Sequence, residues 1–122
     1  MSDISYSIQF RAARGLFNHS INASGVTADM SIDGMISQTL TLTTNAVSIQ
    51  TVNLSSVGLA YLQNLSTHTA STAVVGVNDG GGFVGFCSLN PAEASMLRLT
   101  EGTQYEAKGG DGTKLRVDIL EG

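Results

Sequence analysis

Residues Val57–Arg98 read VGLAYLQNLSTHTASTAVVGVNDGGGFVGFCSLNPAEASMLR, and this stretch holds the densest apolar segments of the chain. Its apolar runs are rich in branched and aromatic residues, and polar or Gly-rich breaks separate them: Leu59–Leu62, Ala73–Val77 and Phe83–Leu89. The break at Asn78–Gly82 supplies the residue types that hairpin loops use. The stretch therefore predicts four short strands, the last beginning at Met96, and it contains no cluster of reactive side chains.

Other parts of the chain alternate apolar and polar residues with a period of two, which is the pattern of half-buried strands. These segments are Ile4–Phe10, Val26–Ile32, Ile36–Thr44, Gln104–Ala107 and Leu115–Ile119. Residues 11–20 are predicted to be a loop, and a shift of the apolar phase predicts a bulge near Thr51. No window carries a helical apolar stripe free of helix-breaking residues.

The spacing of these segments predicts an all-β fold. We count about nine or ten short strands separated by turn signals, which is typical of a sandwich or barrel. The 122 residues fit one domain, with no linker or repeat to divide it. We therefore predict one antiparallel, jelly-roll-like β-sandwich domain over residues 1–122.

Charge is sparse and slightly acidic. The formal net charge is −4, and the six Lys and Arg residues are scattered, so no basic stripe suggests nucleic-acid binding. Only 13% of residues are charged, against about a quarter in ordinary domains. A neutral, Ser- and Thr-rich surface suits burial against another subunit. A sandwich whose solvent face simply uses Thr is the alternative.

The candidate reactive residues do not form a site in the sequence. Cys87 is the single cysteine and is interpreted as a small buried hydrophobe. His19 and His68 are interpreted as exposed loop histidines, because neither has a second ligand at zinc-site spacing. The Gly-Asp runs offer too few oxygens for calcium. Common hydrolase, nucleotide and metalloprotease motifs are missing, so we predict no enzyme activity, cofactor or metal site.

The beginning of the sequence, MSDISYSIQF, has no basic segment followed by an apolar one, as a secretory signal would have. No apolar run approaches the about 20 residues that a membrane span requires. We therefore expect a soluble protein that is made in a cytoplasm, with no membrane partner.

The order of motifs in residues 57–120 resembles a family of small β-rich virion proteins of tailed bacteriophages. The shared order is Gly-x-Ala-Tyr-Leu-x-Asn-Leu, Val-Gly-Val, a Gly-rich turn, Phe-Val-x-Phe, Leu-x-Pro-x-Glu and Leu-Arg-Leu. Where the family tends to have Pro-Gly-Glu, this chain has Pro91-Ala92-Glu93. That difference argues against a turn that needs Gly at its third position.

The resemblance implies a structural virion protein, of the type that decorates or cements a capsid by binding the major capsid protein. A location in the virion and synthesis in the host bacterial cytoplasm follow from it. We also expect a homo-oligomer, with a trimer preferred, since three-fold contacts suit an icosahedral shell. A tail or neck component, or a carbohydrate- or receptor-binding β-module, is the alternative.

Three residues are candidates for an interface. Glu93 and Arg98 match the resemblance and suit a subunit-interface ion pair, with a solvated strand face as the alternative. Phe83 and Phe86 are predicted to lie in the core, although a regular strand would direct them to opposite faces. In that case one of them, with Phe83 the candidate, belongs to an interface.

Overall fold

The computed structural model describes residues 3–31, 33–52, 54–68 and 71–122. All regular elements in these ranges are β-strands, and all their pairings are antiparallel, which confirms the all-β prediction. The chain forms two compact units, Met1–Ser31 and Ile32–Gly122. The sequence predicted one sandwich over residues 1–122, whereas the sandwich occupies the second unit and the first is a hairpin.

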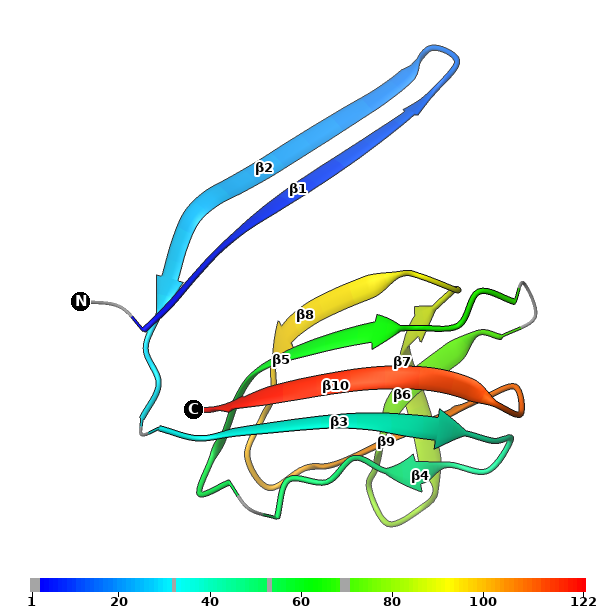
Figure 1. Cartoon of the computed structure of the whole chain (residues 1–122). Helices are drawn as coiled ribbons and strands as arrows, with labels where there is room; N and C mark the ends of the chain where they lie inside the picture. Colours follow the sequence, from blue (N-terminus) through cyan, green and yellow to red (C-terminus); the bar gives the residue numbers. More distant parts are fainter. Residues whose placement is uncertain (1–2, 32, 53, 69–70) are drawn as a thin grey trace. The chain divides into compact units, whose positions relative to one another are not determined.

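The first unit is a long two-stranded ribbon of β1 (Ile4–Arg14) and β2 (Phe17–Ala28), drawn in blue in Figure 1. The prediction of a loop over residues 11–20 was wrong, since Arg14 pairs with Phe17 and the register continues along the hairpin. Only Gly15 and Leu16 turn the chain, and Gly15 has the positive φ of 59° that such tight turns use.

A β-bulge interrupts the alternation of apolar residues in β2. Tyr6 pairs with Val26 and Ile8 pairs with Ala23, so Ser7 faces two residues, of which Gly25 has a φ of 66°. The extra residue shifts the inward–outward alternation of β2 by one position. Ala23 and Val26, which lie on either side of the bulge, therefore point to the same face of the ribbon. The predicted strand Val26–Ile32 is confirmed only to Ala28, and Ile32 lies outside the described residues.

The described residues of the second unit form eight strands. They are β3 (Met35–Leu42), β4 (Val47–Ser48), β5 (Val57–Asn64), β6 (Ala73–Asn78), β7 (Phe83–Leu89), β8 (Ala94–Arg98), β9 (Gln104–Gly109) and β10 (Thr113–Glu121). The four strands predicted in residues 57–98 are confirmed, as is the hairpin loop between β6 and β7. Near Thr51 the predicted bulge was wrong, because Leu54 N donates to Thr51 O at 3.0 Å in a turn outside any strand.

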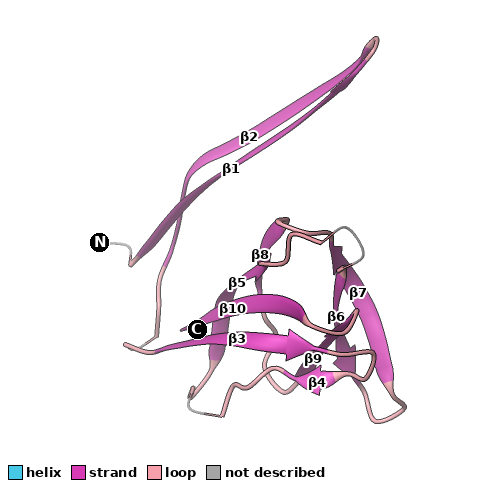
Figure 2. Cartoon of the chain, turned by 45° about the vertical axis from the view of Figure 1, so that its right-hand side comes forward, coloured by secondary structure: helices cyan, strands magenta, loops and turns pink. Residues whose placement is uncertain are grey.

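The pairing of these eight strands is that of a jelly roll. One sheet has the order β3-β10-β5-β8 and the other has the order β4-β9-β6-β7. The first strand of the unit thus pairs with the last, the second with the seventh, the third with the sixth and the fourth with the fifth. An antiparallel ribbon rolled into two sheets has this pattern. Figure 1 shows β10 (red) between β3 and β5, and Figure 2 shows the second sheet beside it.

The core lies between the two sheets. The central strand β10 contributes Leu115, Val117 and Ile119, all fully buried. The prediction that Phe83 and Phe86 lie in the core was wrong: Phe86 is 50% exposed and Phe83 is half-buried outside the core cluster. Both belong to β7, which is an edge strand, and the residues of this strand that reach the core are Leu89 and, partly buried, Cys87.

The turn that joins β7 to β8 forms despite its missing glycine. Glu93 N donates to Asn90 O at 3.0 Å, and Ala92, the third residue of the turn, has a φ of 71°. This is a turn of the type that usually takes Gly at that position. The expectation that Ala92 argues against such a turn was wrong, because neighbouring hydrogen bonds hold it: Ala92 N donates to Asn64 O at 2.9 Å.

Candidate interaction surfaces

The hairpin unit has one apolar face, which we call the hairpin face. Directly paired residues of an antiparallel ribbon lie on the same side, and the register therefore places these residues together. The members are Ile4, Tyr6, Ile8, Phe10 and Ala12 of β1, with Phe17, His19, Ile21, Ala23, Val26 and Ala28 of β2. Within residues 3–31 no further element packs on this face. Phe10 is 56% and Ile21 54% exposed, although they face each other.

The opposite side of the ribbon is polar. It carries Ser5, Gln9 and Arg11, paired with Thr27, Asn22 and Ser20. Arg14 is paired with Phe17 at the tip and is the one charged residue among the paired positions on the side of the hairpin face. The ribbon is thus amphipathic along its length, with one side suited to water and the other suited to burial.

A second apolar surface lies on the edge strand β7. Its sequence, FVGFCSL, contains no charged residue, and Val84 and Phe86 are 55% and 50% exposed. Val75 pairs with Cys87 and Gly76 pairs with Gly85, so Phe86 is the extra residue of a bulge. Bulges of this kind protect edges from strand addition, because they interrupt the row of hydrogen-bonding groups.

The three residues proposed for an interface from the sequence lie near the β7–β8 side of the sandwich. Phe83 is the first residue of β7, and the Lys108 ammonium lies 5.0 Å from its ring centroid. Glu93 is exposed, and its carboxylate accepts a hydrogen bond of 2.7 Å from Asn90 N, which stabilises the turn. Arg98 is exposed at the end of β8. Among the described residues no ion pair joins Glu93 to Arg98.

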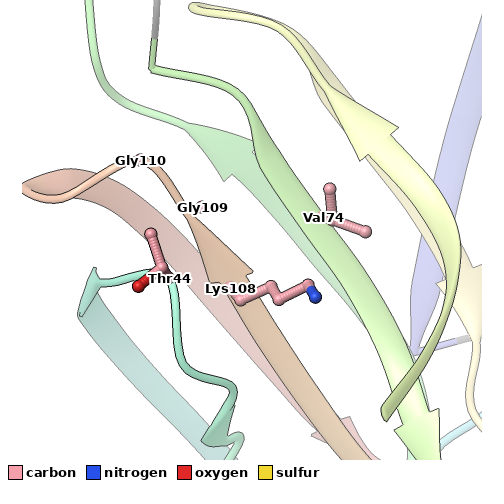
Figure 3. A pocket seen from close by; sticks show the side chains of 5 residues that line it. All are labelled: Thr44, Val74, Lys108, Gly109 and Gly110. Atoms are coloured by element: carbon pink, nitrogen blue, oxygen red, sulfur yellow. The ribbon is translucent and has the colours of Figure 1, made fainter.

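A shallow depression of about 290 Å³ lies on the outer side of the second sheet. It is lined by Thr44, Val74, Lys108, Gly109 and Gly110. Figure 3 shows the Lys108 side chain extending from β9 toward the strand that carries Val74. The lining offers a cation but no carboxylate, thiol or imidazole, so it lacks the pairs of groups that acid–base or nucleophilic catalysis uses.

The remaining reactive side chains are dispersed. Cys87 is partly buried and packs against the core, close to its predicted role. His19 is exposed as predicted, but it lies in a strand rather than a loop, 6.0 Å from the Phe10 ring in an edge-on contact. His68 is exposed in a bend. In the described ranges no three His, Cys, Asp or Glu residues gather as a metal site would require.

Long apolar helices capable of crossing a membrane do not occur in the described part of the chain.

Comparison with known proteins places the chain in no family. No family model matches the sequence, and no curated protein matches it. Among solved structures, the chain is similar to the Yersinia pseudotuberculosis-derived mitogen, with 14% identity and a TM-score of 0.44. The match covers 75% of this chain and 88% of the mitogen. This likeness is too weak to support a comparison of function.

Proposed function

We propose that this protein is a structural virion subunit of a tailed bacteriophage that decorates the capsid and reinforces it by binding the major capsid protein. The observation that carries the proposal is the hairpin face. A ribbon of two strands that exposes Phe10, Phe17 and Ile21 cannot bury them within its own unit. An apolar face of this kind is suited to packing against other protein, as the faces of subunits in an assembly are.

The surface composition supports a role in assembly. Few charges have to be desolvated when a neutral surface is buried, and only 13% of the residues of this chain are charged. Jelly rolls are common in capsid and lectin domains, although the fold by itself assigns no function. The resemblance of residues 57–120 to small phage virion proteins favours a virion protein over a lectin.

The proposed partners are the major capsid protein and further copies of this chain. A trimer on the local three-fold positions of the shell would contact several capsid subunits at once. Multivalent attachment of this kind makes weak single contacts sufficient, because the second and third contacts form within one complex. The role is structural and requires no cofactor.

Electron microscopy tests the proposal directly. Purified protein is mixed with undecorated capsids and, separately, with isolated tails of the phage that encodes it. We expect extra density on the capsid surface and none on tails. Capsids that already carry their full set of decoration proteins are the control and should gain nothing. Density on tails alone, or on neither particle, would contradict the proposal.

A further inference from the structure

We propose that Asp79 is a site of spontaneous modification, at which the side-chain carboxyl condenses with the next backbone nitrogen and reopens as isoaspartate. The sequence contains three Asp-Gly steps, at residues 33–34, 79–80 and 111–112. Gly favours this reaction, because it has no side chain to hinder the attacking nitrogen and adopts many backbone conformations. The surroundings of the three steps differ, and they favour reaction at Asp79.

The reaction requires only the protein and water. Gly80 N attacks Cγ of the protonated Asp79 carboxyl, and the new N–Cγ bond closes a five-membered succinimide. The carboxyl hydroxyl leaves together with the amide proton as water. A water molecule then adds to one of the two ring carbonyls. When the bond between the nitrogen and the backbone carbonyl carbon breaks, the chain continues through the former side chain, and the backbone gains one methylene group.

The side chain of Asp79 is already folded over the peptide bond that would react. Its Oδ1 accepts a hydrogen bond of 2.9 Å from Gly81 N, and the ring closed by this bond contains both Asp79 Cγ and Gly80 N. Residues 79–82 are all exposed and form the loop between β6 and β7. Water therefore reaches the ring, and the loop has room for the added methylene group.

The attacking nitrogen is restrained only by a side chain. Gly80 N donates to Oδ1 of Asn78 at 2.9 Å, and this acceptor moves away when the Asn78 side chain rotates. The amide nitrogen of Asn78 lies 3.4 Å from each carboxylate oxygen of Glu106, which is beyond the usual range for such bonds. A local movement of Asn78 therefore frees Gly80 N without opening a strand.

The step at residues 111–112 is bound to a strand instead. Gly112 N donates to the backbone oxygen of Leu42, the last residue of β3, at 3.0 Å. The next residue, Thr113, is fully buried and donates from N and Oγ1 to Gly110 O, at 3.0 and 2.7 Å. Freeing Gly112 N therefore requires the whole β9–β10 turn to separate from β3.

The step at residues 33–34 is packed against β10. Gly34 O accepts a hydrogen bond of 3.0 Å from Glu121 N. A Cβ added to Gly34 would lie only 2.7 Å from Oε2 of Glu121, which is 3% exposed. Rotating Gly34 so that its nitrogen reaches the Asp33 carboxyl would break this contact. The second and third steps of comparison thus leave Asp79 as the reactive position.

Isoaspartate at position 79 would change the surface beside it. The rearranged residue loses the hydrogen bond to Gly81 N, and Asn78–Phe83 is the last pair of the β6–β7 ladder. We expect this terminal pair to open. Val84, which follows Phe83, is 55% exposed and belongs to the apolar surface of β7. The modification therefore alters one end of that surface as the protein ages.

The first experiment counts isoaspartate in aged protein. The full chain is kept at neutral pH and body temperature for several weeks and then digested. Isoaspartyl methyltransferase with a labelled methyl donor marks each isoaspartate, and peptide mapping locates the label. We expect position 79 to carry at least about five times as much label as either other step, the factor that one hydrogen bond of ordinary strength represents. Asp79→Ser should lose most of the label, and the matched control Asp111→Ser should retain it.

Unfolded protein separates the effect of the structure from that of the sequence. In guanidinium chloride all three Asp-Gly steps lack their hydrogen bonds, so they should be labelled at similar rates. Equal labelling of the three steps in folded protein would overturn the proposal, because the structure would then make no difference. A folded protein without label at position 79 would also overturn it, since the loop would then hold Gly80 N as firmly as a strand does.

Discussion

The hairpin and the sandwich use the same strand-forming residues with opposite results. In the sandwich, Leu115, Val117 and Ile119 alternate along β10 and are fully buried, because a second sheet covers them. In the hairpin, Ile8 and Phe10 alternate equally well along β1 and stay about half exposed. Alternation therefore forms a strand with one apolar face in both units, but only a second layer turns that face into a core. Within residues 3–31 the hairpin has no such second layer.

Amide hydrogen exchange in dilute solution should show the largest difference between the two units. Amides of β10 lie in the centre of a sheet and should exchange only when the sandwich unfolds, with protection of about 5 kcal/mol or more. Amides of β1 should exchange after local opening that costs roughly 1–2 kcal/mol. Raising the protein concentration should protect β1 but not change β10. Equal protection in both units at high dilution would mean that they unfold as one.

Truncation of one apolar side chain in each unit tests the same difference by stability. Leu115→Ala should lower the free energy of unfolding by about 3–5 kcal/mol, because it opens a cavity in a closed core. Ile21→Ala should lower it by less than about 1 kcal/mol in dilute protein, because half of that side chain is already exposed. Urea unfolding monitored by circular dichroism measures both. Similar losses at the two sites would show that the hairpin is covered within the monomer.

A third prediction compares two asparagines. Asn64 is fully buried; its amide nitrogen donates to Ser71 O at 2.7 Å and to Leu89 O at 2.9 Å, and its amide oxygen accepts from Ser66 N. Asn64→Ala leaves these groups without partners and should cost about 3 kcal/mol. Asn22→Ala, on the polar side of the hairpin, should cost less than about 0.5 kcal/mol. Chemical denaturation measures both, and a small loss at Asn64 would show that water replaces its bonds.

The smallest expected effect has the opposite sign. Ala92 has a φ of 71°, a conformation that costs Ala energy but costs Gly little, so Ala92→Gly should stabilise the sandwich by about 0.5–1 kcal/mol. Ala94→Gly, two residues later in β8, should destabilise it by about the same amount, because extended backbone gives Gly no advantage. Thermal unfolding of both variants measures the difference. Destabilisation by both would show that the turn does not hold Ala92 in this conformation.

The local sequence was sufficient to predict most sandwich strands. Ala73–Val77, Phe83–Leu89 and Leu115–Ile119 were recognisable because branched and aromatic residues alternate or cluster between turn residues. At the β6–β7 loop, the side chains of Asn78 and Asp79 accept hydrogen bonds from Gly80 N and Gly81 N, as such turn residues do. These are local interactions, so they can be read from neighbouring residues.

The candidate interaction surfaces were harder to predict from the sequence. The sequence did not predict the hairpin face, because the bulge at Gly25 shifts the apolar alternation of β2 and because the predicted loop over residues 11–20 extended far beyond the actual turn, Gly15-Leu16. Phe86 was assigned to the core because its strand is apolar, whereas exposure depends on β7 being an edge. The Ser24-Gly25 step within an otherwise alternating segment is the signal that a search for bulges would use.

What the sequence determined by itself is therefore the strand character of each segment and the one-sided pattern of side chains, since both depend on residues close together in the chain. The tertiary structure decided which faces are covered. It pairs β3 with β10 and β4 with β9, strands that are far apart in the sequence. It also encloses Leu115 between two sheets and leaves Phe10 and Phe86 exposed. Burial depends on contacts between residues distant in sequence, and no local pattern contains that information.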